Sequence, residues 1–346
     1  MAPRPLAGVR VVEVVRPDCA GITAVAVAFA GRMVAALGGE VTRVLAGGVD
    51  PLASWPPLLP DGSSALHRFL NDAKTTAPAV PTAAGSLLTD DPALAAGWSG
   101  GSTVLVVSSQ ESPAIAHSEL TILAASGLLD IYGDRDAPPL PLPGHQAAYA
   151  AGIAAFNAFI CAHYARAAGQ PFSHSRVSVL DVAFWLNWKH YLAAYLDLPN
   201  TGVGRAEEWR TYRCRDGYIA FVFQDKDLGK IAVLTGDARF TEPRFATQNA
   251  RRENIDAFCR LIADWAGGQT RDAIVARAAG MGLPIGPVLA VGELLDDAQM
   301  LARGFIDLAR GSPTFGHPRL PAVWTASAPD AAPRHSAPSP RQRPPP

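Results

Sequence analysis

Apolar residues in the first part of the chain form short runs of strand length, which alternate with an alanine-rich stretch of helix length. Val9–Val15 and Glu40–Leu45 are the short runs, and Ile22–Leu37 between them has few helix breakers. The pattern predicts a strand, a helix that ends at Gly38-Gly39, and a second strand. Because strand–helix–strand units of this size form right-handed crossovers, we expect the two strands to be parallel.

The middle of the chain has a less regular pattern. Residues 46–101 are rich in Pro, Gly, Ser and Asp, and only Ser64–Asn71 is predicted to be helical there. Thr103–Ser109 and Leu120–Ser126 are apolar runs that predict two more strands. Gln146–Ala168 predicts a long helix, whose aromatic stripe is a packing face. A strand and a further helix are predicted at Arg176–Leu180 and Asp181–Leu196.

A second module is predicted at about residues 200–292. It begins with a hairpin, Tyr212–Phe223, in which Arg215-Asp216-Gly217 forms the turn. Three helices and a last strand follow, at Asp225–Thr235, Arg251–Trp265, Thr270–Met281 and Pro287–Val291. The tail from about Ala326 is rich in Pro, Ala and Ser, so we expect it to be disordered.

Composition narrows the class of protein. The chain has 346 residues, of which 49% are hydrophobic and 18% charged, so it can bury a sizeable core. The formal net charge of −1 gives no reason to expect a nucleic acid or an acidic membrane as partner. The apolar run Ala20–Ala30 is too short to span a bilayer, and no secretory leader precedes it. We therefore expect a cytoplasmic protein.

The cysteines and histidines do not suggest a metal site or disulfides. The four cysteines are far apart, and no CxxC occurs: Cys19, Cys161, Cys214 and Cys259. Free thiols in a reducing compartment are the expected state. No Cys/His cluster has the spacing of metal ligands, so no metal is expected.

Three stretches of the chain carry a resemblance to a known family. The first is Pro5–Val14, continued by Ala20-Gly21 and Arg32–Val44, and the second runs from Ser126 to Gly152. The third, from Tyr212 to Phe305, is the most specific and contains Arg215-Asp216-Gly217-Tyr218, Pro243-Arg244-Phe245, Arg252-Glu253-Asn254, Leu283-Pro284-Ile285-Gly286-Pro287-Val288 and Ala302-Arg303-Gly304. In this order and spacing, the chain resembles the CaiB/BaiF family, the class III CoA-transferases.

The resemblance implies an α/β fold of the interlocked-dimer type. A Rossmann-like large domain is joined to a smaller α/β domain, and two subunits interlock like links of a chain. Mapped onto this sequence, residues 1–199 belong to the large domain and residues 200–292 to the small one. Residues 293–325 return to the large domain, and residues 326–346 form the tail.

The resemblance also implies chemistry on coenzyme A thioesters. Transferases of this family use an aspartate that attacks the donor thioester to form a mixed anhydride, and a carboxylate suits this step because it is both nucleophile and leaving group. CoA then returns to give an enzyme-bound thioester, which the acceptor carboxylate attacks. A related branch, the α-methylacyl-CoA racemases, exchanges the proton α to the thioester with an acid and a base on opposite faces.

The family's catalytic aspartate has no counterpart at its usual place in this chain. It lies four residues before a glycine that resembles Gly152, and the residue there is Ala148. A small shift of the alignment brings Gln146 or His145 to this place. His145 precedes the helix, where the helix dipole would keep it neutral, so it could act as a base or simply pack the loop. Asp134 and Asp136, just upstream, are expected to cap a turn.

Candidates for binding CoA come from the first domain. Asn71-Asp72-Ala73-Lys74 resembles the family's N-x-x-K segment, which implies that Lys74 faces a CoA phosphate. Arg43 falls near another basic position of the family, and for both cations a solvated surface position is the alternative. Thr89-Asp90-Asp91-Pro92 stands where the family's nucleotide-holding segment is expected. No Walker A loop and no G-x-G-x-x-G after a strand occurs, so NAD is not expected.

Several functions therefore stay open. The chain is expected to be an acyl-CoA-handling enzyme that moves CoA between acyl groups. The alternatives are racemase-like α-proton exchange and a non-catalytic or repurposed subunit. A homodimer, or a heterodimer with a paralogue, is the expected assembly. An acid from elsewhere, such as Glu207 or Asp181, could reach the site, although Asp181 at a helix start is better read as a cap. The Gly202–Arg205 segment resembles the family's active-site loop or is an interdomain turn.

Overall fold

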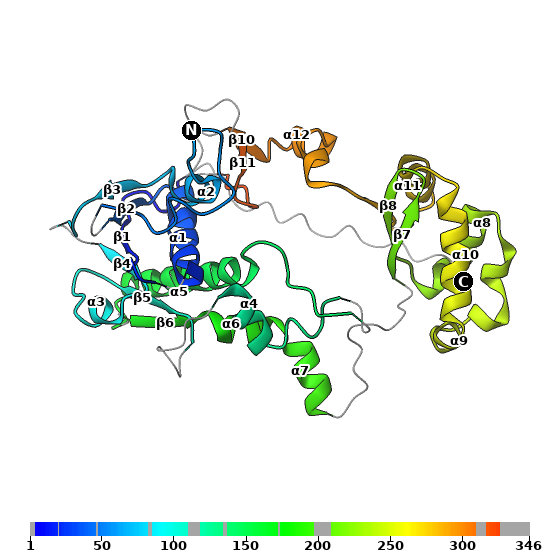
Figure 1. Cartoon of the computed structure of the whole chain (residues 1–346), viewed down its shortest axis with the longest axis horizontal. Coiled ribbons are helices and arrows are strands. Elements are labelled where there is room, and N and C mark those ends of the chain that lie inside the picture. The colour runs from blue at the N-terminus through cyan, green and yellow to red at the C-terminus, as the bar shows by residue number, and fades with distance from the viewer. Residues whose placement is uncertain are drawn as a thin grey trace, which may run out of the picture. The chain divides into compact units, whose positions relative to one another are not determined.

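The computed structural model describes residues 4–19, 21–45, 48–81, 85–109, 118–133, 137–171, 174–196, 209–308 and 316–325. Contacts divide the chain into two units (Figure 1). The first comprises the residues up to Ser126, Pro143–Leu186 and the residues from Arg319, and the second comprises Gly127–Leu142 and Asn187–Pro318. Gly127–Leu142 thus groups with the second unit, although the sequence placed it in the large domain. The predicted boundary at 199/200 lies outside the described residues, and the domain prediction stays a prediction.

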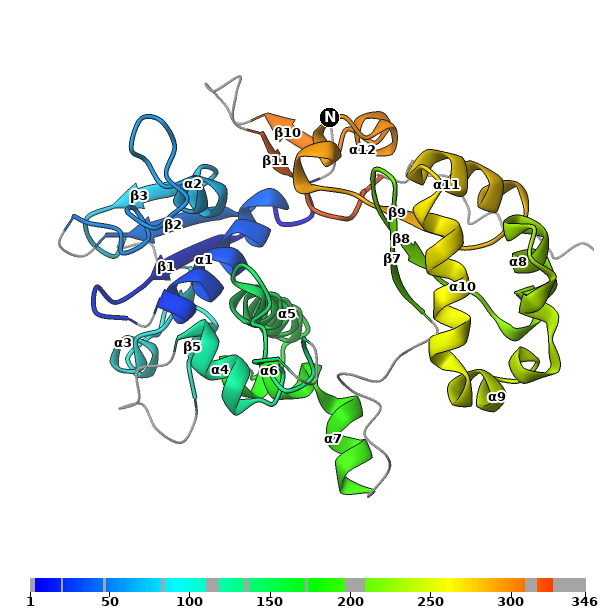
Figure 2. The ribbon, with the colours of Figure 1, turned by 45° about the vertical axis from the view of Figure 1, so that its right-hand side comes forward.

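A six-stranded parallel sheet forms the centre of the first unit (Figures 1 and 2). Its strand order is β3-β2-β1-β4-β5-β6. The strands are β1 (Arg10–Val14), β2 (Glu40–Val44), β3 (Thr75–Ala77), β4 (Ser86–Thr89), β5 (Thr103–Val107) and β6 (His174–Ser178). The chain order reverses at β1, which lies between β2 and β4, and such a point is where α/β sheets commonly bind ligands.

The predicted strand–helix–strand unit is confirmed. β1 and β2 are parallel neighbours, and α1 (Gly21–Ala36) joins them. Nearly every residue of α1 from Ile22 to Gly31 is buried. This agrees with the sequence, because a helix that is apolar on all sides is normally buried. The alanines also let neighbouring elements approach this helix closely.

The long helix α5 (Gln146–Ala167) packs on α1. Gly152 marks the closest approach, because an added Cβ would lie 2.9 Å from the Ala26 carbonyl oxygen and 3.0 Å from the Phe29 Cβ. Among the described residues, α5 alone is long and apolar enough to cross a membrane. It packs instead on α1, β5 and β6, as a core helix does.

The Pro- and Gly-rich region 46–101 contains more regular structure than its pattern predicts. The predicted helix is present as α2 (Ala65–Asn71), and its N-cap Ser64 accepts a hydrogen bond from the His67 amide at 3.0 Å. The strands β3 and β4 and the helix α3 (Pro92–Ala96) were not predicted. Each has five residues or fewer, so it is too short to show a periodicity.

The run at Leu120–Ser126 is helical, and the predicted strand is wrong. α4 spans Glu119–Ala125 and begins at a capping box. The Ser118 Oγ accepts from the Thr121 amide at 3.2 Å, and the Thr121 Oγ1 accepts from the Ser118 amide at 2.8 Å. This reciprocal cap stabilises the helix start, and a short apolar run alone cannot distinguish the two structures.

The second unit has its own sheet and core. β7 (Arg210–Cys214), β8 (Gly217–Phe221) and β9 (Gly286–Val288) form an antiparallel sheet, which confirms the predicted hairpin. Phenylalanines from the sheet and helices meet in its core: Phe221, Phe223, Phe240, Phe245 and Phe258. The other helices and strands are α6 (Val179–Leu186) in the first unit and α7 (Trp188–Tyr195), α8 (Leu228–Thr235), α9 (Gln248–Glu253), α10 (Ile255–Gly267), α11 (Arg271–Gly280), α12 (Ala298–Ala302), β10 (Ile306–Leu308) and β11 (Gly316–Pro318) in the second.

The α1–α5 contact leads to a stability prediction. Gly152→Ala should lower the free energy of unfolding by about 1–3 kcal/mol, because the new methyl group overlaps backbone that cannot move aside. Urea unfolding followed by circular dichroism measures the change. Gly229→Ala is the matched control, since Gly229 is also helical and an added Cβ there meets nothing within 4 Å. An unchanged or higher stability of the Gly152 variant would contradict the close packing.

Candidate active site

The amino end of α5 holds the residues predicted to take part in catalysis. His145 is the N-cap residue, and its side chain makes no capping hydrogen bond within the described part of the chain. Gln146 is exposed, and its Nε2 donates to the Pro143 carbonyl at 3.2 Å. Ala148 is fully buried in the first turn. This end of the helix therefore brings the three predicted positions together without any acid of its own.

Aromatic rings surround His145. Its ring centroid lies 5.5 Å from that of Trp55 and 6.2 Å from that of Tyr149. Trp55 in turn lies on Gly21, the first residue of α1, where an added Cβ would be 1.9 Å from the indole. Burial among these groups lowers the pKa of His145, so the imidazole is neutral at pH 7. The helix dipole predicted a neutral imidazole, and in the structure the cause is burial.

A carboxylate from α4 reaches the same helix end. Glu119 lies in the first turn of α4, and its Oε1 accepts a hydrogen bond from the Ala147 amide at 2.6 Å. Burial raises the pKa of Glu119, and the amides of Ala147 and Ala148 partly oppose that shift. Its Oε2 is buried and has no hydrogen-bond partner among the described residues. Glu119 therefore caps α5 through one oxygen and leaves the other unused.

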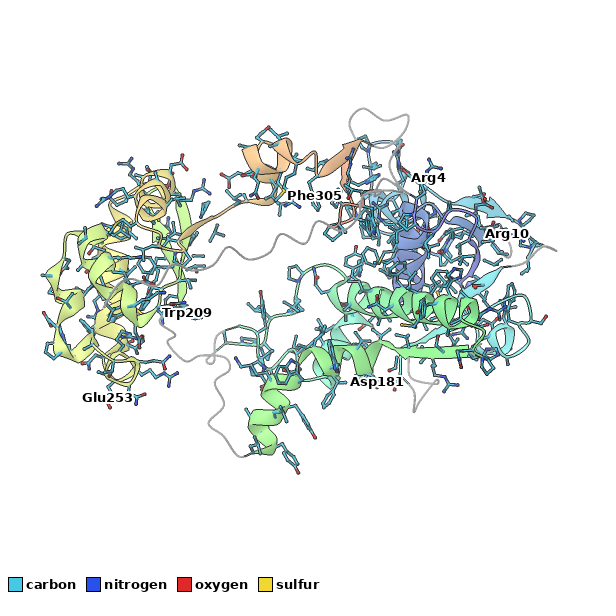
Figure 3. All side chains as sticks on the ribbon, turned by 180° about the vertical axis from the view of Figure 1, so that it is seen from behind. Arg4, Arg10, Asp181, Trp209, Glu253 and Phe305 are labelled. Carbon is cyan, nitrogen blue, oxygen red and sulfur yellow. The ribbon has the colours of Figure 1, made fainter. Side chains whose placement is uncertain are left out.

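Sequence reasoning missed Glu119 because the stretch after it was assigned to a strand. The signal was present in Ser118-Glu119, which is a helix N-cap followed by an acid in the first turn. Of the acids that were considered instead, Asp181 lies within the described residues. Asp181 is exposed in the first turn of α6 (Figure 3), and its amide donates to the Ser178 Oγ at 3.2 Å. Asp134, Asp136, Glu207 and the segment Gly202–Arg205 lie outside the described residues.

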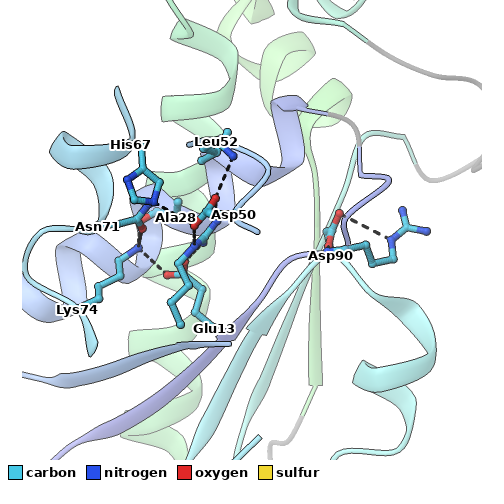
Figure 4. A network of polar contacts seen from close by, with 10 residues as sticks. Glu13, Ala28, Asp50, Leu52, His67, Asn71, Lys74 and Asp90 are labelled. Atoms are coloured by element: carbon cyan, nitrogen blue, oxygen red, sulfur yellow. Dashed lines mark hydrogen bonds and ion pairs between the residues drawn. The ribbon is translucent and has the colours of Figure 1, made fainter. Parts of the chain in front are cut away.

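The predicted CoA-binding residues belong to a second group of polar side chains (Figure 4). Arg43 on β2 lies beside Glu13 on β1, and its guanidinium donates to Glu13 and to both oxygens of Asp50. The Lys74 Nζ lies 2.7 Å from the Glu13 Oε2, and it donates to the Ala28 carbonyl and the Asn71 Oδ1, each at 2.8 Å. We call Glu13, Arg43, Asp50, His67, Asn71 and Lys74 the buried charge network.

Burial and pairing set the charges of this network. Burial lowers the pKa of Lys74 to about 8, although Glu13 opposes that shift. Burial also disfavours the charged forms of Arg43 and Asp50, but its acidic partners raise the pKa of Arg43. Hydrogen bonds with His67, at 3.2 Å, and with Arg43 hold the pKa of Asp50 well below its usual range. Because ionised forms are compensated by neighbours, the group can remain charged away from water.

The network changes the interpretation of three predicted residues. The side chains of Arg43 and Lys74 are 2% and 1% exposed, so the solvated surface position considered as an alternative is wrong for both. Their cationic atoms already have acidic partners. The Asn71 Nδ2, by contrast, is buried and has no partner within the described ranges. Contact of these three residues with CoA stays a prediction.

The segment Thr89–Pro92, which stands in place of the family's nucleotide-holding stretch, is acidic, and its two aspartates bond to the protein itself. Asp90, at the carboxyl end of β4, is buried and accepts from the Arg16 amide at 2.9 Å and from the Thr23 Oγ1 at 3.1 Å. Burial raises its pKa and also raises that of the neighbouring Cys19 thiol to about 12. Asp91 caps α3. In the described part of the chain, no three His, Cys, Asp or Glu side chains gather as metal ligands would.

Comparison with solved structures relates this fold to known proteins. A CAIB/BAIF family protein from Brucella suis matches with a TM-score of 0.78 at 22% identity, over 93% of each chain. Rv3272 from Mycobacterium tuberculosis, in an orthorhombic crystal form, matches with a TM-score of 0.73 at 20% identity, over 94% of each chain. At these identities the likeness establishes the fold.

A protein-family model establishes more than the fold. The model of CoA-transferase family III matches residues 110–342, which is more than half of the chain. This match and the CAIB/BAIF fold confirm the resemblance that the sequence motifs indicated. The chain belongs to CoA-transferase family III, the CaiB/BaiF family, and at the family level it is an acyl-CoA-handling protein.

Proposed function

We propose that this protein moves coenzyme A between acyl groups, and that the reaction takes place at the amino end of α5. The observation that carries the proposal is that the amino end of α5 holds both a neutral imidazole, His145, beside Trp55 and Tyr149, and a carboxylate, Glu119, which accepts from the Ala147 amide. Aromatic walls exclude water from a thioester, and helix amides stabilise negative charge that develops on its oxygen. The methyl side chain of Ala148 can act neither as a nucleophile nor as a base, so neighbouring residues must supply the chemistry.

A second candidate is exchange of the proton α to the thioester. It is favoured by the lowered pKa of His145, since a neutral imidazole can accept this proton at pH 7. Incubation of an acyl-CoA in deuterium oxide with the protein would reveal it as a mass gain at the α-carbon, and His145→Ala should abolish that gain. The third candidate, a non-catalytic subunit, is favoured by Ala148 and would require a paralogue as partner.

We further propose that Asn71 contacts coenzyme A. Lys74 holds the Asn71 side chain through its Oδ1, and Arg43 holds Lys74 through Glu13, which both cations contact. The free Nδ2 of Asn71 supports a direct hydrogen bond, whereas the two cations have internal partners. No metal is proposed for this site. A cytoplasmic location, where acyl-CoA is available, remains part of the proposal.

We also propose that the protein is a dimer, in which a second copy covers α7. Along the part of the chain that the structure describes, α7 buries none of its residues. Its exposed side chains are nevertheless aromatic and apolar, and they include Trp188, Tyr191, Leu192 and Tyr195. Exposed apolar surface of this kind is typical of interfaces. A paralogue in place of the second copy is the rival outcome.

Binding of CoA is the first test of this function. Calorimetry should detect CoA and acetyl-CoA with micromolar affinity, which corresponds to about −8 kcal/mol. Asn71→Ala should weaken binding about tenfold, because one hydrogen bond to the ligand is lost. Asn157→Ala, an exposed asparagine on α5, is the control. If millimolar CoA does not bind to the wild-type protein, the proposed function is wrong.

The role of Lys74 can be separated from ligand contact. Lys74→Met should lower the free energy of unfolding by about 3 kcal/mol, because Glu13 loses one of its two buried cations. Urea unfolding at pH 7 measures this, with the exposed Lys226→Met as a control that should change by less than about 0.5 kcal/mol. Unchanged stability together with lost CoA binding would instead make Lys74 a phosphate contact.

The dimer proposal has a matched pair of variants. Tyr195 on α7 and Tyr164 on α5 are both 74% exposed. Tyr195→Ser combined with Trp188→Ser should shift the mass measured by light scattering from dimer to monomer, whereas Tyr164→Ser should leave it unchanged. A wild-type protein that is monomeric at all concentrations would contradict the proposal.

A further inference from the structure

The carboxylate of Glu119 lies at the first turn of α5, where Ala148 stands in place of the family's aspartate and the helix has no acid of its own. Ala147 and Ala148 are adjacent in the first turn of α5, and both amides lie close enough to Glu119 to influence its pKa. The hydrogen bond of 2.6 Å from the Ala147 amide fixes the position of the Glu119 carboxylate at this turn. An acid from another helix, α4, is therefore held at a turn that has no acid of its own.

Capping of α5 does not account for the whole side chain. One oxygen is enough to satisfy the helix amide, yet the Glu119 Oε2 is buried and has no partner in the described structure. A buried carboxylate oxygen without a donor costs free energy, so a purely structural cap would favour a smaller or fully paired group. The free oxygen retains its lone pairs for a reacting atom.

The surroundings suit a nucleophile. Burial disfavours the ionised carboxylate and thereby increases its reactivity, while the helix amides keep part of the charge in place. The aromatic group of His145, Trp55 and Tyr149 lies at the same helix end and can cover an acyl chain. Burial, together with the nearby charge of Glu119, raises the pKa of the Tyr149 hydroxyl.

We propose that Glu119 is the covalent nucleophile of this chain; the proposal rests on the proposed function of CoA transfer. A carboxylate oxygen of Glu119 attacks the thioester carbonyl carbon, a mixed anhydride forms, and the C–S bond breaks to release CoA thiolate. The thiolate attacks the glutamyl carbonyl and expels the donor as its carboxylate, which leaves a glutamyl–CoA thioester. The acceptor carboxylate attacks this thioester, thiolate leaves again, and its attack on the acceptor carbonyl regenerates Glu119.

Covalent trapping tests the proposal. The wild-type protein is incubated with acetyl-, propionyl- and succinyl-CoA and treated with hydroxylamine, which converts an activated glutamyl group to a hydroxamate. Peptide mass spectrometry should find the hydroxamate at Glu119. Glu119→Gln keeps an oxygen that can accept from the Ala147 amide, so the fold and CoA binding should persist while transfer falls on the order of 1000-fold or more.

Asp181→Asn is the control variant, because Asp181 is another acid that the sequence suggested for the site. This variant should form the hydroxamate at Glu119 and transfer CoA at the wild-type rate. A hydroxamate at another acid, or undiminished transfer by a folded Glu119→Gln, overturns the role of Glu119 and leaves CoA transfer intact. A wild-type protein that neither binds nor transfers CoA overturns the proposed function, and the role of Glu119 with it.

Discussion

The close packing of α1 against α5 is the contact on which the arrangement of the first unit depends. At Gly152 the two helices approach so closely that a single methyl group would overlap the backbone of α1. One turn earlier along α5, Tyr149 packs on Phe29 of α1 with ring centroids 4.9 Å apart. The start of α5, and with it His145 and the amides that bind Glu119, is therefore positioned by α1.

The same helix also contacts the buried charge network. The Ala28 carbonyl accepts from Lys74, and Gly31 leaves room for Glu13, whose Oε2 would lie 1.9 Å from an added Cβ. Two acids, Glu13 and Asp50, are paired with two cations, Arg43 and Lys74, so the charges balance within the buried charge network. Such a balanced group favours one register of β1, β2 and α1 over others, because a slip would leave a buried ion unpaired.

The sequence predicted the elements whose periodicity is long and whose partners are near in the chain. The β1–α1–β2 unit, α5 and the hairpin of the second unit follow from apolar runs, glycine breaks and turn residues. The motifs between Tyr212 and Phe305 indicated the family, which the family model confirmed. These features depend on local preferences, such as hydrophobic periodicity and turn-forming residues, which can be read from one sequence.

The remaining features depend on contacts between distant residues. Glu13, Arg43 and Lys74 come together only when the strands pair, so nothing in their spacing marks them as one network. Glu119 meets Ala147 across 28 positions, and the short run after it can be strand or helix until its cap forms. Sequence reasoning could name Ala148 as a position without an acid, but it could not locate the carboxylate that lies beside it.

The buried lysine of the network links folding to the uptake of protons. Lys74 has a pKa of about 8 in the folded chain, against 10.5 for an ordinary lysine. Between these two pH values the unfolded chain binds a proton that the folded chain has released. Unfolding therefore consumes protons in mildly alkaline solution, and the contribution of this residue to stability grows as the pH rises through that interval.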